Sequence, residues 1–298
     1  MQKHPSQSEA QWTILKLLQW TTSYFTSHHV ESPRASAEIL LAHALNIGRI
    51  DLYIRYDQPL DLSELKLFKA LIRRRLNREP VAYITGETEF WSKSLCVTKD
   101  VLIPRPETEC LVEAVQRFLT VDHDPSIRWI LELGTGSGAI TLALVSLFPQ
   151  HLFFASDCKL QIVKLARQNA IRHENDKQIK FFVGDWFGPV QQSTGRFDVI
   201  VSNPPYVRSD VIGGLQPEIA RFEPRRALDG GADGLDCIDQ IIRQAFRFLK
   251  KGGRLYLEIG HDQRMEVSKR ISDNGNYREI RFSRDYGGHD RVVQMEKR

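Results

Sequence analysis

The chain has 298 residues, of which 42% are hydrophobic and 26% are charged, and its formal net charge is only +4. These values exclude a disordered or fibrous chain and predict one large or two ordinary globular domains. The four cysteines have no C-x-x-C spacing, which excludes a disulfide scaffold and a thiolate zinc site, and we expect no bound metal. Because no apolar segment opens the chain and glycines interrupt its longest uncharged stretch, we expect a cytoplasmic protein without a membrane span.

Residues 1–80 have the apolar spacing of helices, and we predict that they form an N-terminal helical bundle. A helix is expected to open at Ser8, which forms a capping box with Gln11, and another at Ser32, before a proline. Asp61 with Glu64 predicts a third capped helix. The basic side chains at positions 66, 69, 73, 74, 75 and 78 of that region are interpreted as a solvated helix face rather than a binding surface.

Residues 81–103 change character. Isoleucine, valine and aromatic residues cluster on both sides of Gly86, and this pattern predicts a β-hairpin linker with its turn near that glycine. Arg105, Glu107 and Glu109 follow. They either line the mouth of a binding site or simply begin a proline-rich helix, whose first turn favours acids.

Residues 104–298 alternate between strand and helix patterns, which predicts an α/β domain with a parallel sheet and helices on both faces. Two further strand patterns, at 277–282 and 291–295, predict an antiparallel pair at the sheet edge. We therefore expect a Rossmann-like, mostly parallel, seven-stranded sheet whose last strand is antiparallel. The other five candidate strands are 129–133, 152–156, 179–183, 197–202 and 254–259.

A glycine loop links the first of these strands to a helix. It runs Gly134, Thr135, Gly136, Ser137, Gly138, which is neither the dinucleotide fingerprint nor a lysine-bearing phosphate loop. Asp157 ends the next strand, 23 positions after the first glycine, where an acid accepts hydrogen bonds from ribose hydroxyls. The two features predict a site for an adenosyl group without phosphates, as in S-adenosylmethionine; the alternative is a plain glycine-rich connection beside a surface aspartate.

Asp185 and Trp186 follow the third strand. At that edge an acid can accept from the adenine amino group, and an indole can pack on the ring. The alternative, an ordinary buried aromatic beside a solvated acid, stays open.

Asn203, Pro204, Pro205 and Tyr206 follow the fourth strand, and we call this segment the NPPY turn. Proline at 204 forces Asn203 into an extended conformation, and neither proline has an N–H to occupy nearby acceptors. The turn therefore offers two acceptors, the Asn203 side-chain oxygen and the Pro204 carbonyl, to the two hydrogens of a planar NH₂ group. Tyr206 can stack on the same substrate. The alternative is a proline-rich exit loop without a catalytic role.

These motifs resemble class I S-adenosylmethionine-dependent methyltransferases that act on planar NH₂ groups. Segments 79–86, 102–109 and 222–234 narrow the resemblance to the HemK/PrmC family of peptide chain release factor glutamine methyltransferases, over nearly the whole chain. The resemblance implies N5-methylation of the glutamine in the Gly-Gly-Gln loop of bacterial release factors, with S-adenosylhomocysteine as product. It also implies that residues 104–298 are the methyltransferase domain and that residues 1–80 dock the substrate.

By the same resemblance, the glycine loop, Asp157, Trp186 and Asn203 contact the methyl donor, and the NPPY turn holds the glutamine. We expect a monomer whose partners are release factors, with no direct nucleic-acid contact. An adenine-N6 methyltransferase of DNA or RNA stays as the alternative, since adenine also presents a planar NH₂ group, although the chain has no strong basic stripe. A binding module that kept only the fold is the third hypothesis.

Overall fold

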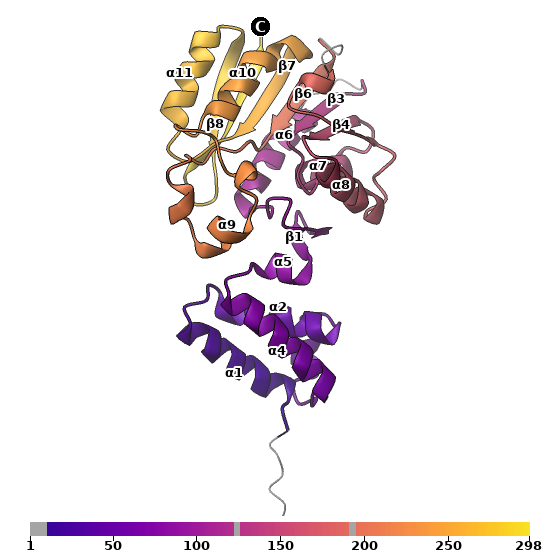
Figure 1. Cartoon of the computed structure of the whole chain (residues 1–298). Helices are drawn as coiled ribbons and strands as arrows, with labels where there is room; N and C mark the ends of the chain where they lie inside the picture. Colours follow the sequence, from indigo (N-terminus) through magenta and orange to yellow (C-terminus); the bar gives the residue numbers. More distant parts are fainter. Residues whose placement is uncertain (1–10, 122–125, 191–194) are drawn as a thin grey trace, which may run out of the picture. The chain divides into compact units, whose positions relative to one another are not determined.

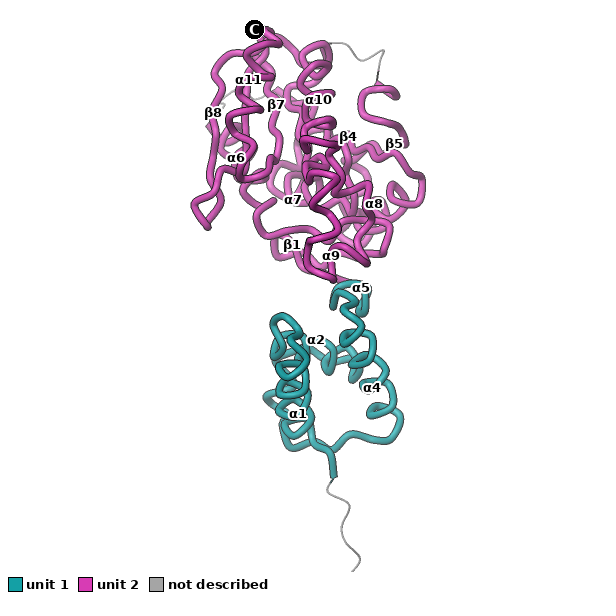
Figure 2. Tube along the Cα trace, turned by 60° about the vertical axis from the view of Figure 1, so that its left-hand side comes forward, with its two compact units in different colours: residues 1–86 teal, residues 87–298 magenta. Residues whose placement is uncertain are grey.

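The computed structural model describes residues 11–121, 126–190 and 195–298. The chain divides into two compact units, residues 1–86 and 87–298, which Figure 2 colours separately. Within the described parts of the chain, no helix combines the length and the apolar character needed to cross a membrane.

The first unit is helical. Its core includes Ile14, Phe25, Leu40 and Phe68, all fully or almost fully buried. The helix start predicted at Asp61 and Glu64 is confirmed, and it is a capping box: Asp61 Oδ1 accepts from the Glu64 N–H at 2.8 Å and Glu64 Oε2 accepts from the Asp61 N–H at 2.8 Å. The helices are α1 (Ile14–Ser27), α2 (Pro33–Leu45), α3 (Asp51–Ile54), α4 (Leu62–Leu76) and α5 (Val81–Thr85).

Two sequence predictions for this unit, the helix start at Ser8 and the solvated basic face, are not confirmed as stated. The helix start expected at Ser8 lies outside the described residues, and α1 begins at Ile14 after a Thr13 cap. The basic run is not a uniformly solvated face: Arg75 is only 4% exposed, and the Arg74 guanidinium pairs with buried Glu79 at 2.7 Å. Packing, which a charge pattern does not reveal, buries Arg75, whereas the Arg74 side chain stays 42% exposed while it pairs with Glu79.

The β-hairpin linker predicted for residues 81–103 is wrong in its first five residues. Val81–Thr85 form helix α5, which starts after Pro80 and ends at Gly86 in a left-handed conformation (φ 79°). The hairpin is instead β1 (Glu87–Phe90) and β2 (Lys93–Cys96), with its turn at Trp91 and Ser92, both at positive φ, and it belongs to the second unit. These residues form a helix despite their strand propensity, because the Arg74 side chain binds the carbonyls of Tyr83 and Ile84 and stabilises the helical turn.

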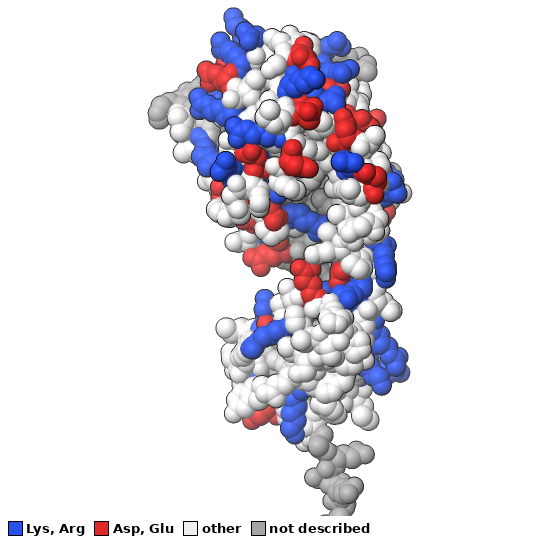
Figure 3. Space-filling model, turned by 90° about the vertical axis from the view of Figure 1, so that its left-hand side faces the viewer, with Lys and Arg blue, Asp and Glu red and all other residues white. Residues whose placement is uncertain are grey.

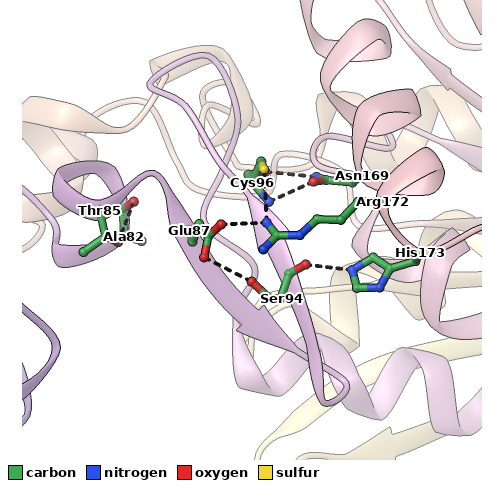
Figure 4. A network of polar contacts seen from close by, with 8 residues as sticks. All are labelled: Ala82, Thr85, Glu87, Ser94, Cys96, Asn169, Arg172 and His173. Carbon is green, nitrogen blue, oxygen red and sulfur yellow. Dashed lines mark hydrogen bonds and ion pairs between the residues drawn. The ribbon is translucent and has the colours of Figure 1, made fainter. Parts of the chain in front are cut away.

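The hairpin is attached to helix α8 (Leu160–Arg172) by the polar network of Figure 4. The buried Asn169 amide accepts from Cys96 N–H at 2.8 Å and donates to the Cys96 carbonyl at 2.9 Å. The same amide nitrogen donates to the carbonyl of Ser137, in the glycine loop, at 2.8 Å. One side chain therefore holds both the hairpin and the glycine loop.

A seven-stranded sheet forms the centre of the second unit, in the order β5-β4-β3-β6-β7-β9-β8. All neighbouring pairs are parallel except β7 with β9 and β9 with β8. The predicted Rossmann-like sheet with an antiparallel last strand is thus confirmed. The terminal pair is also antiparallel as predicted, but β9 inserts between β7 and β8, so of this pair only β8 lies at a sheet edge. The strands are β3 (Trp129–Leu133), β4 (Leu152–Asp157), β5 (Ile179–Val183), β6 (Phe197–Ser202), β7 (Leu249–Glu258), β8 (Tyr277–Arg284) and β9 (Asp290–Lys297).

Helices cover both faces of this sheet (Figure 1). Alternate residues of β3 point to opposite faces, so Ile130 packs with the α6 and α7 side and Leu131 packs with the α10 and α11 side. Both layers are closely packed apolar cores, and they position the loops at the carboxyl ends of the strands. The remaining helices are η1 (Pro106–Thr108), α6 (Glu109–Val121), α7 (Ala139–Leu147), η2 (Gly188–Val190), η3 (Ile212–Gly214), α9 (Pro217–Phe222), η4 (Arg225–Ala227), α10 (Asp236–Phe248) and α11 (Arg264–Asn274).

We predict that Asn169→Ala lowers the free energy of unfolding by about 3 kcal/mol, because it leaves one buried and two partly buried backbone groups without their partner. Arg172→Ala, which removes the half-exposed ion pair with Glu87, is the matched control and should cost less than about 1 kcal/mol. Urea unfolding of both variants measures the difference, and equal losses would contradict the assigned role of Asn169.

Candidate active site

The site lies where β3 and β6 end side by side. The two strands are parallel, with Leu133 opposite Ser202, and the Ser202 hydroxyl donates to the Leu133 carbonyl at 2.7 Å. The next residues are Gly134 and Asn203, so the glycine loop and the NPPY turn leave the sheet at the same edge. In doubly wound sheets this is the switch point where ligands bind.

One pocket brings most of the sequence-predicted residues together. Its lining does not include Gly138, Pro204 or Tyr206. The predicted residues that do line it are Gly134, Thr135, Gly136, Ser137, Asp157, Asp185, Trp186, Asn203 and Pro205.

The glycine loop needs its glycines for conformation. Gly134, Gly136 and Gly138 all have positive φ, at 72°, 54° and 86°. Gly138 lies outside the pocket and caps α7 with φ 86°, and an added Cβ would make only ordinary contact with Ala166 of α8 at 3.4 Å. The positive φ, rather than lack of space, is therefore what favours glycine at this position.

Asp157 ties the loop to the neighbouring strand. Its Oδ2 accepts from the Gly136 N–H at 3.1 Å, and its Oδ1 accepts from Arg226 at 3.3 Å. Each carboxylate oxygen can accept more than one hydrogen bond, so the group keeps capacity for ligand hydroxyls. Asp157 is only 8% exposed, which restricts approach to the pocket side.

The pocket wall is acidic. Asp100, Glu132, Asp157 and Asp185 line it, and Arg226 is the single basic side chain among the lining residues. A ligand with phosphates would meet repulsion here, whereas a cationic ligand would be attracted. The arrangement fits a sulfonium compound that carries an adenosyl group.

Glu132 is the most buried of these acids, at 1% exposure. Its Oε2 accepts from the Thr135 hydroxyl at 2.8 Å, from the Thr141 N–H at 3.1 Å and from the Thr141 hydroxyl. Burial raises the pKa of this carboxyl to about 7, and the hydrogen bonds from Thr141 and Thr135 oppose the rise. The carboxyl thus connects the end of β3 to the glycine loop and to α7.

Asn203 is half-buried, and its amide nitrogen donates to the Thr108 hydroxyl oxygen at 3.1 Å. Its side-chain oxygen accepts no hydrogen bond within the described residues. The Tyr206 hydroxyl, in contrast, donates to Glu258 at 3.0 Å, and the ring packs against the α10 side of the core. Burial raises the pKa of Tyr206, and Glu258 adds to the effect. The tyrosine therefore supports the turn from behind.

Several lining residues escape the sequence-based prediction. Val101, Leu102 and Pro104 form one wall, together with Thr108, and Arg226 closes another. The family resemblance could have indicated most of these residues, since they lie within segments 102–109 and 222–234, which carry that resemblance. Arg105 from the first segment pairs with buried Glu223 from the second at 2.5 Å, which gives Arg105 a structural task in joining them.

We predict that Glu132→Gln changes the pH dependence of stability. The folded protein holds the Glu132 proton more tightly than the unfolded chain, so this group's contribution to stability falls as pH rises from about 4.5 to 7. The stability of the wild type relative to the variant should fall by up to about 3 kcal/mol across that window, at about 1.4 kcal/mol per pKa unit. Urea unfolding at several pH values measures it, and a pH-independent difference would disprove the assignment.

Comparison with known proteins shows what the two units are similar to. Residues 16–86 match the PrmC N-terminal domain, and residues 128–295 match a methyltransferase domain. The release factor glutamine methyltransferase of Rhodopirellula baltica is 37% identical over 97% of this chain and 98% of its own length. That of Geobacter sulfurreducens is 39% identical over 95% and 96%.

A solved structure, the hMettl16 catalytic domain in complex with the MAT2A 3′UTR hairpin 6, is similar with a TM-score of 0.57 at 14% identity. It covers 74% of this chain and 80% of that one, and it supports the fold alone. A methyltransferase domain of this fold class uses S-adenosylmethionine as methyl donor. With two relatives above 30% identity over nearly its full length, the chain belongs to the family of release factor glutamine methyltransferases.

Proposed function

We propose that the protein transfers a methyl group from S-adenosylmethionine to the side-chain nitrogen of the glutamine in the Gly-Gly-Gln loop of peptide chain release factors. The observation that carries this proposal is the orientation of Asn203. Its amide nitrogen is bound to Thr108, which leaves its oxygen available to a substrate NH₂ group at the pocket. Family membership supports the choice of substrate.

The acidic pocket is the proposed donor site. Asp157 would hold the ribose hydroxyls, while Asp185 and Trp186 would contact the adenine. The absence of a basic side chain from the glycine loop, and the acids around it, fit a donor that is cationic and has no phosphates. When bound, the donor supplies an electrophilic methyl group and leaves as S-adenosylhomocysteine.

The NPPY turn is proposed to prepare the glutamine for attack. A carboxamide nitrogen is a poor nucleophile because its lone pair is delocalised. Asn203 Oδ1 and the Pro204 carbonyl would accept its two hydrogens, orient the nitrogen and raise its electron density. The nitrogen–carbon bond forms as the carbon–sulfur bond breaks, and one amide proton passes to water afterwards. Pro205 and Tyr206 would keep the turn rigid.

Asn203→Ala should lower kcat for release-factor methylation by about 10²–10³-fold, because it removes one preorganised acceptor. Donor affinity, measured by calorimetry, should change little. Methyl transfer is followed by mass spectrometry of the Gly-Gly-Gln peptide from a release-factor digest. Turnover like the wild type in this variant would refute the mechanism, and label appearing on nucleic acid instead of the release factor would favour the adenine alternative.

Residues 1–86 are proposed to dock the substrate. A groove between α1 and α4 is lined by aromatic and aliphatic side chains and by Lys69 and Arg73, with no acid among its lining residues. Trp12 and Trp20 are 41% and 46% exposed, and the Trp20 ring stacks on Tyr24 at 4.8 Å. Figure 3 shows a largely uncharged face on this unit, with basic residues towards its margins. Such a surface suits an apolar segment with acidic neighbours.

Trp20→Ala should raise KM for the release factor about tenfold, since a large exposed aromatic is a typical interface anchor. Its kcat at saturating substrate and its donor affinity should stay within about twofold of the wild type. Tyr56→Ala, an exposed aromatic of the same unit outside the groove, is the control. Equal KM values for the two variants would exclude the groove as the docking site.

We further propose that the enzyme acts in the cytoplasm as a monomer and without a metal ion. Light scattering during gel filtration measures the molar mass and tests whether the enzyme is a monomer. Full activity in the presence of a chelator is expected if the enzyme needs no metal ion.

A further inference from the structure

Glu258 is a buried acid that the reaction described above does not use. It ends β7 and has no solvent exposure. Its Oε1 accepts from the Tyr206 hydroxyl at 3.0 Å, whereas its Oε2 has no hydrogen-bond partner within the described residues. A buried carboxyl that is only partly satisfied costs stability, so its presence behind the NPPY turn calls for a functional reason.

Groups that favour and groups that disfavour the ionised form of Glu258 surround its carboxyl. Arg291 from β9 faces it but is paired with Asp285 at 3.1 Å, and Glu107 from η1 and Cys110 from α6 face it as well. Burial raises the pKa of Glu258 to about 7, while the Thr108 and Tyr206 hydroxyls and Arg291 oppose the rise. The carboxyl therefore changes charge near neutral pH.

Thr108 connects this acid to Asn203. The Thr108 side chain is 3% exposed, interacts with Glu258 and accepts from the Asn203 amide nitrogen at 3.1 Å. A hydroxyl has one proton to donate, and an ionised carboxylate can only accept. The Thr108 hydroxyl acts on the Glu258 carboxyl without forming a hydrogen bond of normal geometry, so Oε2 stays without a partner. With Glu258 ionised, charge attraction favours the Thr108 proton on the carboxylate side, and the Thr108 oxygen then presents lone pairs to Asn203. Only the NH₂ end of the asparagine amide can then face Thr108.

We propose that Glu258 is a positioning residue for methyl transfer: through Thr108 it sets the orientation of the Asn203 amide, and through Tyr206 it holds the other end of the NPPY turn. This rests on the proposed function, in which the Asn203 oxygen accepts from the substrate. The main chain of the turn is held separately, because Gln263 donates to the Tyr206 carbonyl at 3.0 Å. Loss of Glu258 should thus misorient one amide rather than unfold the turn.

Protonation of Glu258 would release this constraint. The Thr108 hydroxyl could then donate to the Asn203 oxygen, and the amide could reverse. Glu258→Gln imitates that state, since the glutamine NH₂ can donate to Thr108 while its oxygen still accepts from Tyr206.

We expect Glu258→Gln to lower kcat for release-factor methylation about 10- to 100-fold, because a displaced catalytic group near the reacting atoms has an effect of this size. KM for the methyl donor should stay within about twofold. Thr108→Val should show a similar loss, Thr108→Ser should restore most of the activity, and the double variant should lose no more than either single variant. The kcat of the wild type should rise with pH through about 7, and that of Glu258→Gln should not.

Asp198→Asn is the matched control, since Asp198 is a buried carboxylate at the other end of the sheet, paired with Arg128 and Lys250. It should lower the melting temperature and leave kcat unchanged. Unchanged kcat in Glu258→Gln, or additive losses in the double variant, would overturn the proposal.

A second measurement does not depend on activity. The side-chain NH₂ resonances of Asn203, assigned with Asn203→Asp, should shift in Glu258→Gln and Thr108→Val and not in Asp198→Asn. If these shifts occur while the wild type methylates no release factor, the proposed function fails and the positioning role stands. If they do not occur in an active enzyme, the positioning role fails alone.

Discussion

The parallel pairing of β3 with β6 is the constraint on which the rest of the site depends. The two strands are separated by more than sixty residues, yet Leu133 lies opposite Ser202 and the serine hydroxyl binds the leucine carbonyl. This register starts the glycine loop and the NPPY turn at the same level of one sheet edge. A slip of one residue would turn Ser202 to the opposite face and move the NPPY turn away from the glycine loop. Strand order and register therefore bring the two loops together, and the side chains of the site depend on that placement.

The buried carboxyls at that sheet edge have different structural roles. Asp157 and Glu132 organise the glycine loop through its N–H and hydroxyl groups, and they also make the pocket acidic. Glu258 lies behind the NPPY turn and, in our proposal, controls the direction of one asparagine amide. Taking each carboxyl out of water costs free energy, and each is held by donors from neighbouring loops. In our proposal a cationic donor would offset part of that cost where the acids face the pocket, and its binding would stabilise the folded protein.

The β1–β2 hairpin is more than a connection between two units. Asn169 binds the hairpin and the glycine loop with one amide, so both segments share a common support on α8. Residues 101–108 then continue along the pocket wall and supply Thr108 to the NPPY turn. The segments 102–109 and 222–234, on which the family resemblance rests, thus contribute Leu102, Pro104, Thr108 and Arg226 to the pocket lining.

Sequence alone determined the α/β class, the strand positions and the residues of both motifs, because apolar periodicity and glycine or proline spacing are local properties of the chain. It also determined the Asp61 capping box, which needs only residues within one turn. Only the tertiary structure decided that Val81–Thr85 form a helix, that Arg75 is buried, and that the Tyr206 hydroxyl binds Glu258. Each of these outcomes depends on a partner that is distant in the sequence or fixed by packing, and burial and pairing with such partners outweigh local propensity.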